Sequence, residues 1–193
     1  MKTKYLSIAG FIMIFSFLLI SCSDSTNGIE PRNTDLGEVE FSLSGDIDGQ
    51  RSGSAFFSME DQGGHTFQLT FMDGFEGRQT FAFYITRYRL NAFEMPDTGT
   101  YEIDGNLFNF SADYDDYSTG DWTDAGTYTD AYCDDVLDQG GTLTINSRTE
   151  QQITGSFSFT VASFDDFETC NLLGYLQVQG EFRAVPFENS LLF

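Results

Sequence analysis

The sequence predicts an all-β fold, an antiparallel β-sandwich of about nine or ten strands, with an open or closed antiparallel β-barrel as the alternative. Three observations lead to this prediction. Apolar and polar side chains alternate along most of the chain after residue 37, and short glycine-containing turn signals separate the alternating runs. No segment there has the apolar spacing of an amphipathic helix of about ten residues.

The first expected strand covers residues 38–44, where valine, phenylalanine and leucine alternate with glutamate and serine. Successive side chains of a strand point to opposite faces, so this pattern is typical of a half-buried antiparallel strand. The same alternation predicts strands over residues 65–71, 81–85, 143–145, 157–161 and 176–184.

Turn signals lie between these runs. Asp-Gly between alternating segments is a strong hairpin signal, because these residues tolerate the backbone angles of tight turns. Such Asp-Gly and Gly-Gly pairs occur at residues 48–49, 63–64, 73–74, 104–105 and 140–141.

The N-terminus has a different pattern. Lys2 and Lys4 precede an apolar run over residues 8–20, which is shorter than the roughly 20 residues that span a bilayer. Leu19-Ile20-Ser21-Cys22 then resembles the lipobox of bacterial lipoproteins. We therefore expect a signal peptide over residues 1–21, a lipidated Cys22 with a polar tether over 22–37, and one domain over 38–193.

The lipoprotein resemblance implies attachment to the membrane through acyl chains on Cys22. Two or three chains hold a protein durably, whereas one gives marginal binding. In the Gram-negative members of this family, aspartate after the cysteine favours retention in the inner membrane. This chain has Ser23 there, so we expect a cell-envelope protein of the outer membrane.

Cleavage after residue 21 removes both lysines of the chain. Seven basic side chains (nine less the two lysines) remain against thirty acidic ones, a formal charge of −23. A nucleic-acid partner is therefore excluded, since phosphate binding needs a cationic surface. An acidic, lysine-free surface is also typical of proteins adapted to salt.

The assignment of Cys22 to lipid attachment leaves two other cysteines to be explained. If Cys22 carries lipid, Cys133 and Cys170 remain as a pair in an oxidising compartment, and we predict a disulfide between them. The alternative is two buried thiols that pack as small apolar groups.

Residues 113–138 are acidic and weakly patterned, and we interpret them as an insertion in the β domain. Clustered carboxylates are the oxygen ligands that calcium prefers. The spacing does not match an EF-hand, so a calcium site remains one hypothesis and a solvated acidic loop the other. The candidate ligands are Asp113, Asp115, Asp116, Asp121 and Asp124.

The same stretch mixes aromatic side chains with carboxylates, a combination that suits glycan binding. Aromatic faces stack on sugar rings, and carboxylates accept hydrogen bonds from sugar hydroxyls. The candidate residues are Tyr117, Trp122 and Tyr128, with Trp122 the single tryptophan of the chain. The alternative is that these rings pack back on the sheet.

Catalytic signatures are weak. His65 is the single histidine, and the chain contains no Gly-x-Ser-x-Gly sequence. With thirty acidic residues, some carboxylate pair always has a suitable separation, so such a pair is not an argument for catalysis. We expect a protein that is not an enzyme.

The C-terminal third carries a second resemblance. Residues 141–145, 153–159 and 180–187 are similar to an uncharacterised group of small all-β lipoproteins of Bacteroidetes-type bacteria. That resemblance implies a β-rich, lipid-anchored domain and transfers no catalytic residue. The sequence thus favours a binding or envelope-interaction module for an unknown protein or glycan, with calcium as its candidate cofactor. The alternatives are a glycan-binding domain and a β-barrel carrier of a small apolar ligand.

Overall fold

The strands account for most of the domain, and the described residues include no helical element. In this computed structural model the described residues are 36–60, 65–74, 79–90, 94–106, 108–118, 126–130, 133, 137–165 and 168–187. The ten strands are β1 (Glu38–Gly45), β2 (Gly49–Glu60), β3 (His65–Met72), β4 (Phe81–Leu90), β5 (Gly99–Ile103), β6 (Phe110–Asp116), β7 (Gly126–Thr129), β8 (Gly140–Arg148), β9 (Ile153–Phe164) and β10 (Leu172–Pro186).

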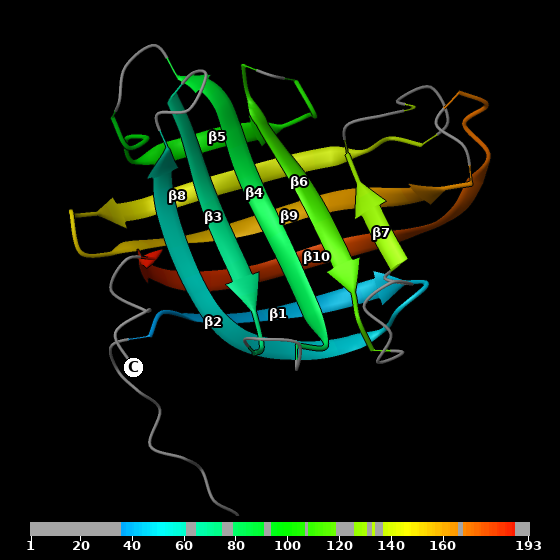
Figure 1. The fold of residues 1–193 in the computed structure, drawn as a ribbon, viewed down its shortest axis with the longest axis horizontal. Coiled ribbons are helices and arrows are strands. Elements are labelled where there is room, and N and C mark those ends of the chain that lie inside the picture. The colour runs from blue at the N-terminus through cyan, green and yellow to red at the C-terminus, as the bar shows by residue number, and fades with distance from the viewer. Residues whose placement is uncertain are drawn as a thin grey trace, which may run out of the picture. The chain divides into compact units, whose positions relative to one another are not determined.

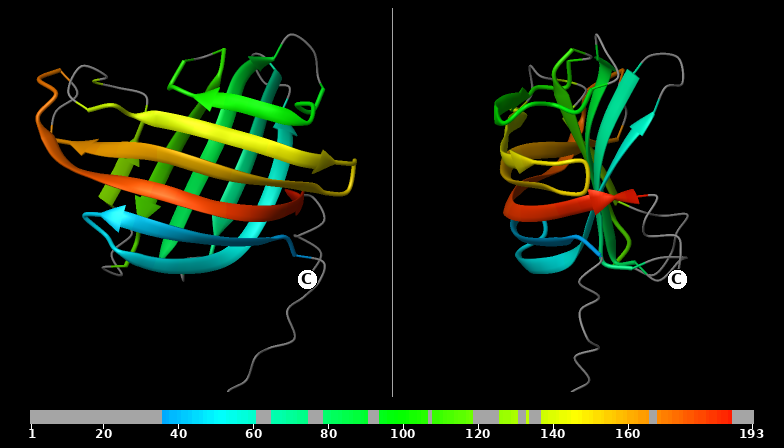
Figure 2. Two further views of the ribbon diagram at one scale, coloured as in Figure 1. Left: turned by 180° about the vertical axis from the view of Figure 1, so that it is seen from behind. Right: turned by 90° about the vertical axis from the view of Figure 1, so that its left-hand side faces the viewer.

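The strands form two layers that cross each other (Figure 1). β3, β4, β6, β7 and the second half of β2 make the layer nearer the viewer, and the view from behind shows β8, β9, β10 and β1 running across it (Figure 2). The first half of β2 lies beside β1 in that second layer, so β2 passes from one layer to the other. Hydrogen-bonded pairing continues from one layer into the other, so each described strand has a partner on both sides. The structure therefore combines the two layers of the predicted sandwich with the closed pairing of the alternative barrel.

The interior is filled by aromatic rings from both layers. Phe83 of β4 stacks on Phe71 of β3 with ring centroids 4.2 Å apart, and it meets Phe41 of β1 edge-on at 5.0 Å. Phe157 of β9 contacts the same ring from the opposite layer at 5.2 Å. These side chains are the inner members of alternating strands, so the period of two in the sequence builds the core directly.

Gly180 shows why one inner position carries no side chain. It lies on β10 opposite Phe41, and a Cβ atom there would be 2.4 Å from the carbonyl oxygen of Glu40 and 2.5 Å from the Cβ of Phe41. The missing side chain allows β1 and β10 to approach each other. We infer that any larger residue at this position would push the two strands apart.

The all-β class is confirmed, and the described residues form ten strands, in agreement with the predicted nine or ten. The strands pair mostly antiparallel, as predicted, with two short parallel contacts, one between β5 and β6 at Ile103–Phe110 and one between β10 and β2 at residues 185–186 of β10. Both parallel contacts are short and lie where the chain passes between the layers.

The segment 113–138 is not wholly an insertion, which corrects the sequence prediction. Residues 113–116 belong to β6, and residues 126–129 form β7, which pairs with β6 over four residues. β7 reaches β9 at a single residue pair, Thr129–Ala162. The wall of the fold is therefore most thinly paired where β5, β6, β7 and β9 meet, and we call this region the β5–β7 junction.

Candidate binding site

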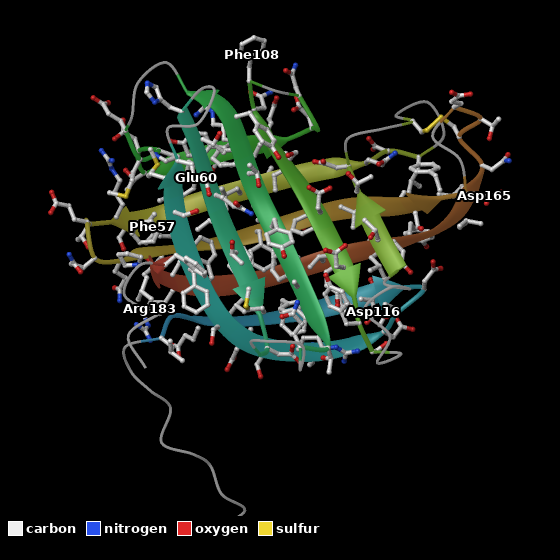
Figure 3. All side chains as sticks on the ribbon, viewed as in Figure 1. Phe57, Glu60, Phe108, Asp116, Asp165 and Arg183 are labelled. Atoms are coloured by element: carbon white, nitrogen blue, oxygen red, sulfur yellow. A yellow bond between two sulfur atoms is a disulfide. The ribbon has the colours of Figure 1, made fainter. Side chains whose placement is uncertain are left out.

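The structure separates the aspartates that were candidates for calcium. Asp113 and Asp115 lie two residues apart on β6 and point to its outer side. Asp116 lies on the other side of the strand, the side of the buried Tyr114. Asp116 lies at the end of β6, away from Phe108 at the opposite end of the molecule (Figure 3). Its carboxylate accepts hydrogen bonds from the backbone N–H and hydroxyl of Ser118. Asp121 and Asp124 lie outside the described residues.

The described residues contain no group of three or more histidine, cysteine, aspartate or glutamate side chains that could hold a metal ion. The aspartates of β6 do not form such a group because side chains alternate along a strand, so neighbouring carboxylates point to opposite faces. Calcium binding by this segment stays a prediction.

The outer side of β6 instead brings carboxylates next to tyrosines and threonines. Cross-strand pairing places Tyr84 of β4 opposite Asp113, and Thr129 of β7 on the other side of the same aspartate. One row further, Thr127 lies beside Asp115. We call this surface the tyrosine–aspartate face, and it consists of Tyr84, Asp113, Asp115, Tyr117, Thr127 and Thr129.

Hydrogen bonds already organise the carboxylates of this face. The Thr127 hydroxyl donates to Asp115 Oδ1 at 2.9 Å, and the Tyr117 hydroxyl donates to Asp115 Oδ2 at 3.3 Å. Thr129 donates a side-chain hydrogen bond to Asp113. An ionised carboxylate has about four lone-pair positions, so Asp115 can accept further hydrogen bonds from a ligand.

The ionisation states of the face follow from burial and from the neighbouring charges. Burial, and then the charges of Asp115 and Asp113, raise the pKa of Tyr84. Burial, and then the charge of Asp115, raise the pKa of Tyr117 to about 12. Burial also raises the pKa of Asp113. Both tyrosines therefore keep their protons at neutral pH and present O–H donors beside the carboxylate acceptors.

The residues predicted for glycan binding are only partly on this face. Tyr117 is on it, half-buried beside Asp115. Tyr128 is on the inner side of β7, 9% exposed, with its ring edge-on to Tyr114, so it cannot stack on a sugar. Trp122 lies outside the described residues. Tyr84 was missed, because its place beside Asp113 depends on the pairing of β4 with β6.

No protein-family model matches this chain. Searches of curated proteins and of solved structures also found no significant match. The residues and their geometry are therefore the basis for any function.

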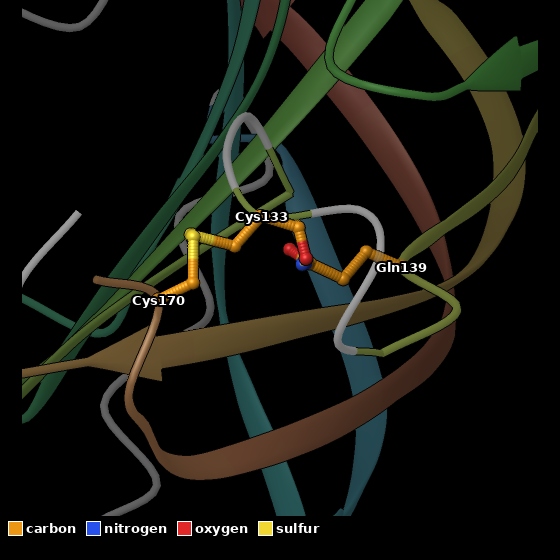
Figure 4. Close-up of a disulfide and its surroundings, with 3 residues drawn as sticks. All are labelled: Cys133, Gln139 and Cys170. Carbon is orange, nitrogen blue, oxygen red and sulfur yellow. A yellow bond between two sulfur atoms is a disulfide. The ribbon is translucent and has the colours of Figure 1, made fainter. Parts of the chain in front are cut away.

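The predicted disulfide between Cys133 and Cys170 is confirmed (Figure 4). It joins the segment after β7 to the turn between β9 and β10, with Cα atoms 5.6 Å apart. The side-chain amide of Gln139, just before β8, donates to the Cys133 carbonyl at 3.4 Å. The disulfide therefore forms a covalent link across the outside of the β5–β7 junction.

A second polar surface lies on the other layer. A groove of about 580 Å³ is bordered by serine, threonine, glutamine and glutamate side chains of β1, β2, β8, β9 and β10, with Glu40 and Glu181 as its carboxylates. Ser42, Gln179 and Ser158 follow one another across three adjacent strands in register. Phe41 and Phe157 border the groove as well, but each is 2% exposed and its ring points inward. The groove thus offers hydrogen-bonding groups and no aromatic face.

The described part of the chain includes no helix of the length and apolarity needed to cross a bilayer. The predicted signal peptide, Cys22 and nearly all of the predicted tether lie outside the described residues. Lipid attachment therefore stays a prediction.

Proposed function

We propose that this chain is a lipid-anchored, non-enzymatic binding module of the bacterial cell envelope, held in the outer membrane through Cys22. The lipobox-like Leu19-Ile20-Ser21-Cys22 supports this proposal, together with the absence of lysine after residue 4. A polyanionic domain gains nothing from anionic headgroups, so acyl chains alone must hold it at the membrane.

The anchor is tested with the substitution Cys22→Ser in the full-length precursor expressed in a Gram-negative host. We expect the wild-type protein in the membrane fraction, with labelled palmitate incorporated. The variant should lose the label completely and leave the outer-membrane fraction. A variant that remains labelled, or a wild-type protein without label, contradicts the anchor. The conservative variant Ser23→Thr is the control and should behave as wild type.

We propose further that the ligand is a neutral saccharide bound on the tyrosine–aspartate face. The observation that carries this is the Asp115 carboxylate, which accepts hydroxyl hydrogens from Thr127 and Tyr117 while tyrosine rings lie close by. A sugar hydroxyl presents the same donor chemistry, and a ring stacked on tyrosine adds apolar contact. The surrounding negative charge disfavours acidic sugars.

The alternative of a β-barrel carrier would need interior space for an apolar ligand. Instead, the rings that line the interior contact one another at distances such as 4.2 Å between Phe71 and Phe83. We therefore do not propose the carrier function.

Binding is tested by screening the mature protein against an array of neutral oligosaccharides and measuring the best binder by calorimetry. We expect Asp115→Asn to weaken binding by about 10- to 100-fold, because a hydrogen bond to a charged group contributes roughly 1.5–3 kcal/mol. Tyr84→Phe should retain most of the affinity, since the stacking surface stays, while Tyr84→Ala should lose it. The measurements are repeated with EDTA to separate saccharide binding from calcium.

Ser158→Trp is the matched control, because it fills the groove on the other layer and leaves the tyrosine–aspartate face intact. Unchanged affinity in Ser158→Trp together with a loss in Asp115→Asn supports the proposed face. The reverse pattern would assign the saccharide to the groove. No binding to any oligosaccharide of the array would refute the saccharide proposal altogether.

A further inference from the structure

Asp130 is a buried carboxylate at the β5–β7 junction. It follows β7 directly, and its backbone N–H donates to the Ala112 carbonyl at 3.2 Å, so the ladder between β6 and β7 continues to this residue. Asp130 is two residues after Tyr128, so its side chain points to the same side of the strand, towards the interior of the fold. Asp130 is 1% exposed, and neither carboxylate oxygen has a hydrogen-bond partner among the residues that the structure describes.

The groups around this carboxyl do not compensate a negative charge. The backbone N–H groups of Ala112, Gly105 and Asp130 itself lie near enough to favour ionisation in part, but not with hydrogen-bond geometry. From β6, the Asp113 carboxylate opposes ionisation. In the turn between β5 and β6, the charge of Asp104 is engaged by Asn106 and Asn109. β9 contributes the apolar Ala162 opposite Thr129. None of the described groups that act on this carboxyl is basic.

Asp130 is also next to a residue of the tyrosine–aspartate face. Thr129 precedes it and donates to Asp113, so a movement of the backbone at Asp130 away from β6 would also displace the hydroxyl that holds Asp113. β7 is four residues long and is joined to β9 at one residue pair. Little other pairing resists such a movement.

We propose that Asp130 is a proton-binding site that controls the closure of β7 against β6, and with it the assembly of the tyrosine–aspartate face. The protonated side chain stays inside the wall and keeps Thr129 on Asp113. The ionised side chain leaves the interior for water and releases that hydrogen bond. The consequence for ligand binding rests on the proposed function, whereas the opening of β7 does not.

The direction of the pH dependence follows from burial, which raises the pKa of Asp130 from its ordinary 3.8 to about 7. The closed form therefore holds its proton up to near neutral pH, whereas an opened form releases it near pH 4. Opening is least favourable below pH 4 and becomes more favourable as the pH rises to 7. With these values, the equilibrium constant for opening rises on the order of 100-fold between pH 5 and pH 8.

Hydrogen exchange of the mature protein measures this opening without a ligand. Mass spectrometry of peptides covering residues 126–130, corrected for intrinsic exchange rates, should show that rise of about 100-fold in the wild type. Asp130→Asn is neutral at every pH and should show a change of less than about 3-fold. Asp138→Asn, an exposed carboxylate nearby, is the matched control and should behave as wild type.

A pH-independent exchange in the wild type, or an Asp130→Asn variant that keeps the full pH dependence, would overturn the proposal. If Asp130→Asn does not fold, the carboxyl carbon shift of Asp130 in the wild type decides instead, and a midpoint below pH 5 overturns it. Saccharide affinity equal at pH 5 and pH 8, despite increased opening, would remove the link to the face. Absence of saccharide binding would refute the proposed function and leave the exchange result standing.

Discussion

Replacing Phe83 with alanine is expected to lower the free energy of unfolding by about 3–5 kcal/mol, the cost typical of removing a buried phenylalanine. Phe83 is fully buried, and it touches rings from both layers. Its neighbours include Phe41, Phe71, Phe81, Tyr114, Phe157 and Phe159. The cavity left by the ring cannot be filled from one side alone, because the neighbours are held by different strands.

Urea unfolding of the protein tests this expectation, with the midpoint falling and the slope unchanged. Phe108→Ala is the matched control, since Phe108 is 62% exposed in the turn before β6. That substitution should change the free energy of unfolding by less than about 0.5 kcal/mol. A loss below about 1.5 kcal/mol for Phe83→Ala would mean that the two layers collapse into the space, contrary to the packing described above.

Removing the disulfide is expected to have a comparable effect. Cys133 and Cys170 are 37 residues apart, and closing such a loop in the unfolded chain contributes roughly 4 kcal/mol in the chain-entropy model. The double substitution Cys133→Ser and Cys170→Ser should lower the free energy of unfolding by about this amount. Serine is close to cysteine in size, so the change removes the bond with little change in packing.

The same denaturation experiment with reducing agent provides the comparison for the disulfide. Wild-type protein in dithiothreitol should unfold at the midpoint of the double serine variant, and the variant itself should not respond to the reductant. Both cysteines have positive φ angles, 66° and 52°, a backbone region that serine also enters at a cost. The comparison therefore separates the covalent bond from the backbone strain. Equal stability with and without the bond would contradict the loop-entropy explanation.

Most of the fold could be predicted from the sequence wherever one face of a strand is buried and the other is solvated. β2 was not predicted because both of its faces are buried at Ala55, Phe56 and Phe57, so its sequence shows no alternation. Phe56 belongs to the outer side of its strand, where the ring of Phe187 covers it at 5.7 Å. Tertiary contact of this kind hides the alternation from the sequence.

The candidate site could be predicted only in part, because it depends on register. Asp113, Asp115 and Tyr117 were recognised by composition. The acidic residues concealed the strand pattern, in which the buried Ala112 and Tyr114 alternate with the outward-pointing aspartates. Tyr84 joins the site through the pairing of β4 with β6, which a single sequence does not contain. Asp130 resembled the surrounding acidic residues, and only its burial distinguishes it.

The closed pairing of the ten described strands has a consequence for the lipid-anchored protein proposed above. Lipid-anchored molecules are confined to a surface and meet often, and an unpaired strand edge would let copies polymerise edge to edge. This fold presents partners on both sides of each described strand, with the β5–β7 junction as its thinnest point. The disulfide and the buried Asp130 both lie at that point. Reduction combined with alkaline pH should therefore be the condition in which this protein aggregates first, with β6 and β7 as the strands that exchange between molecules.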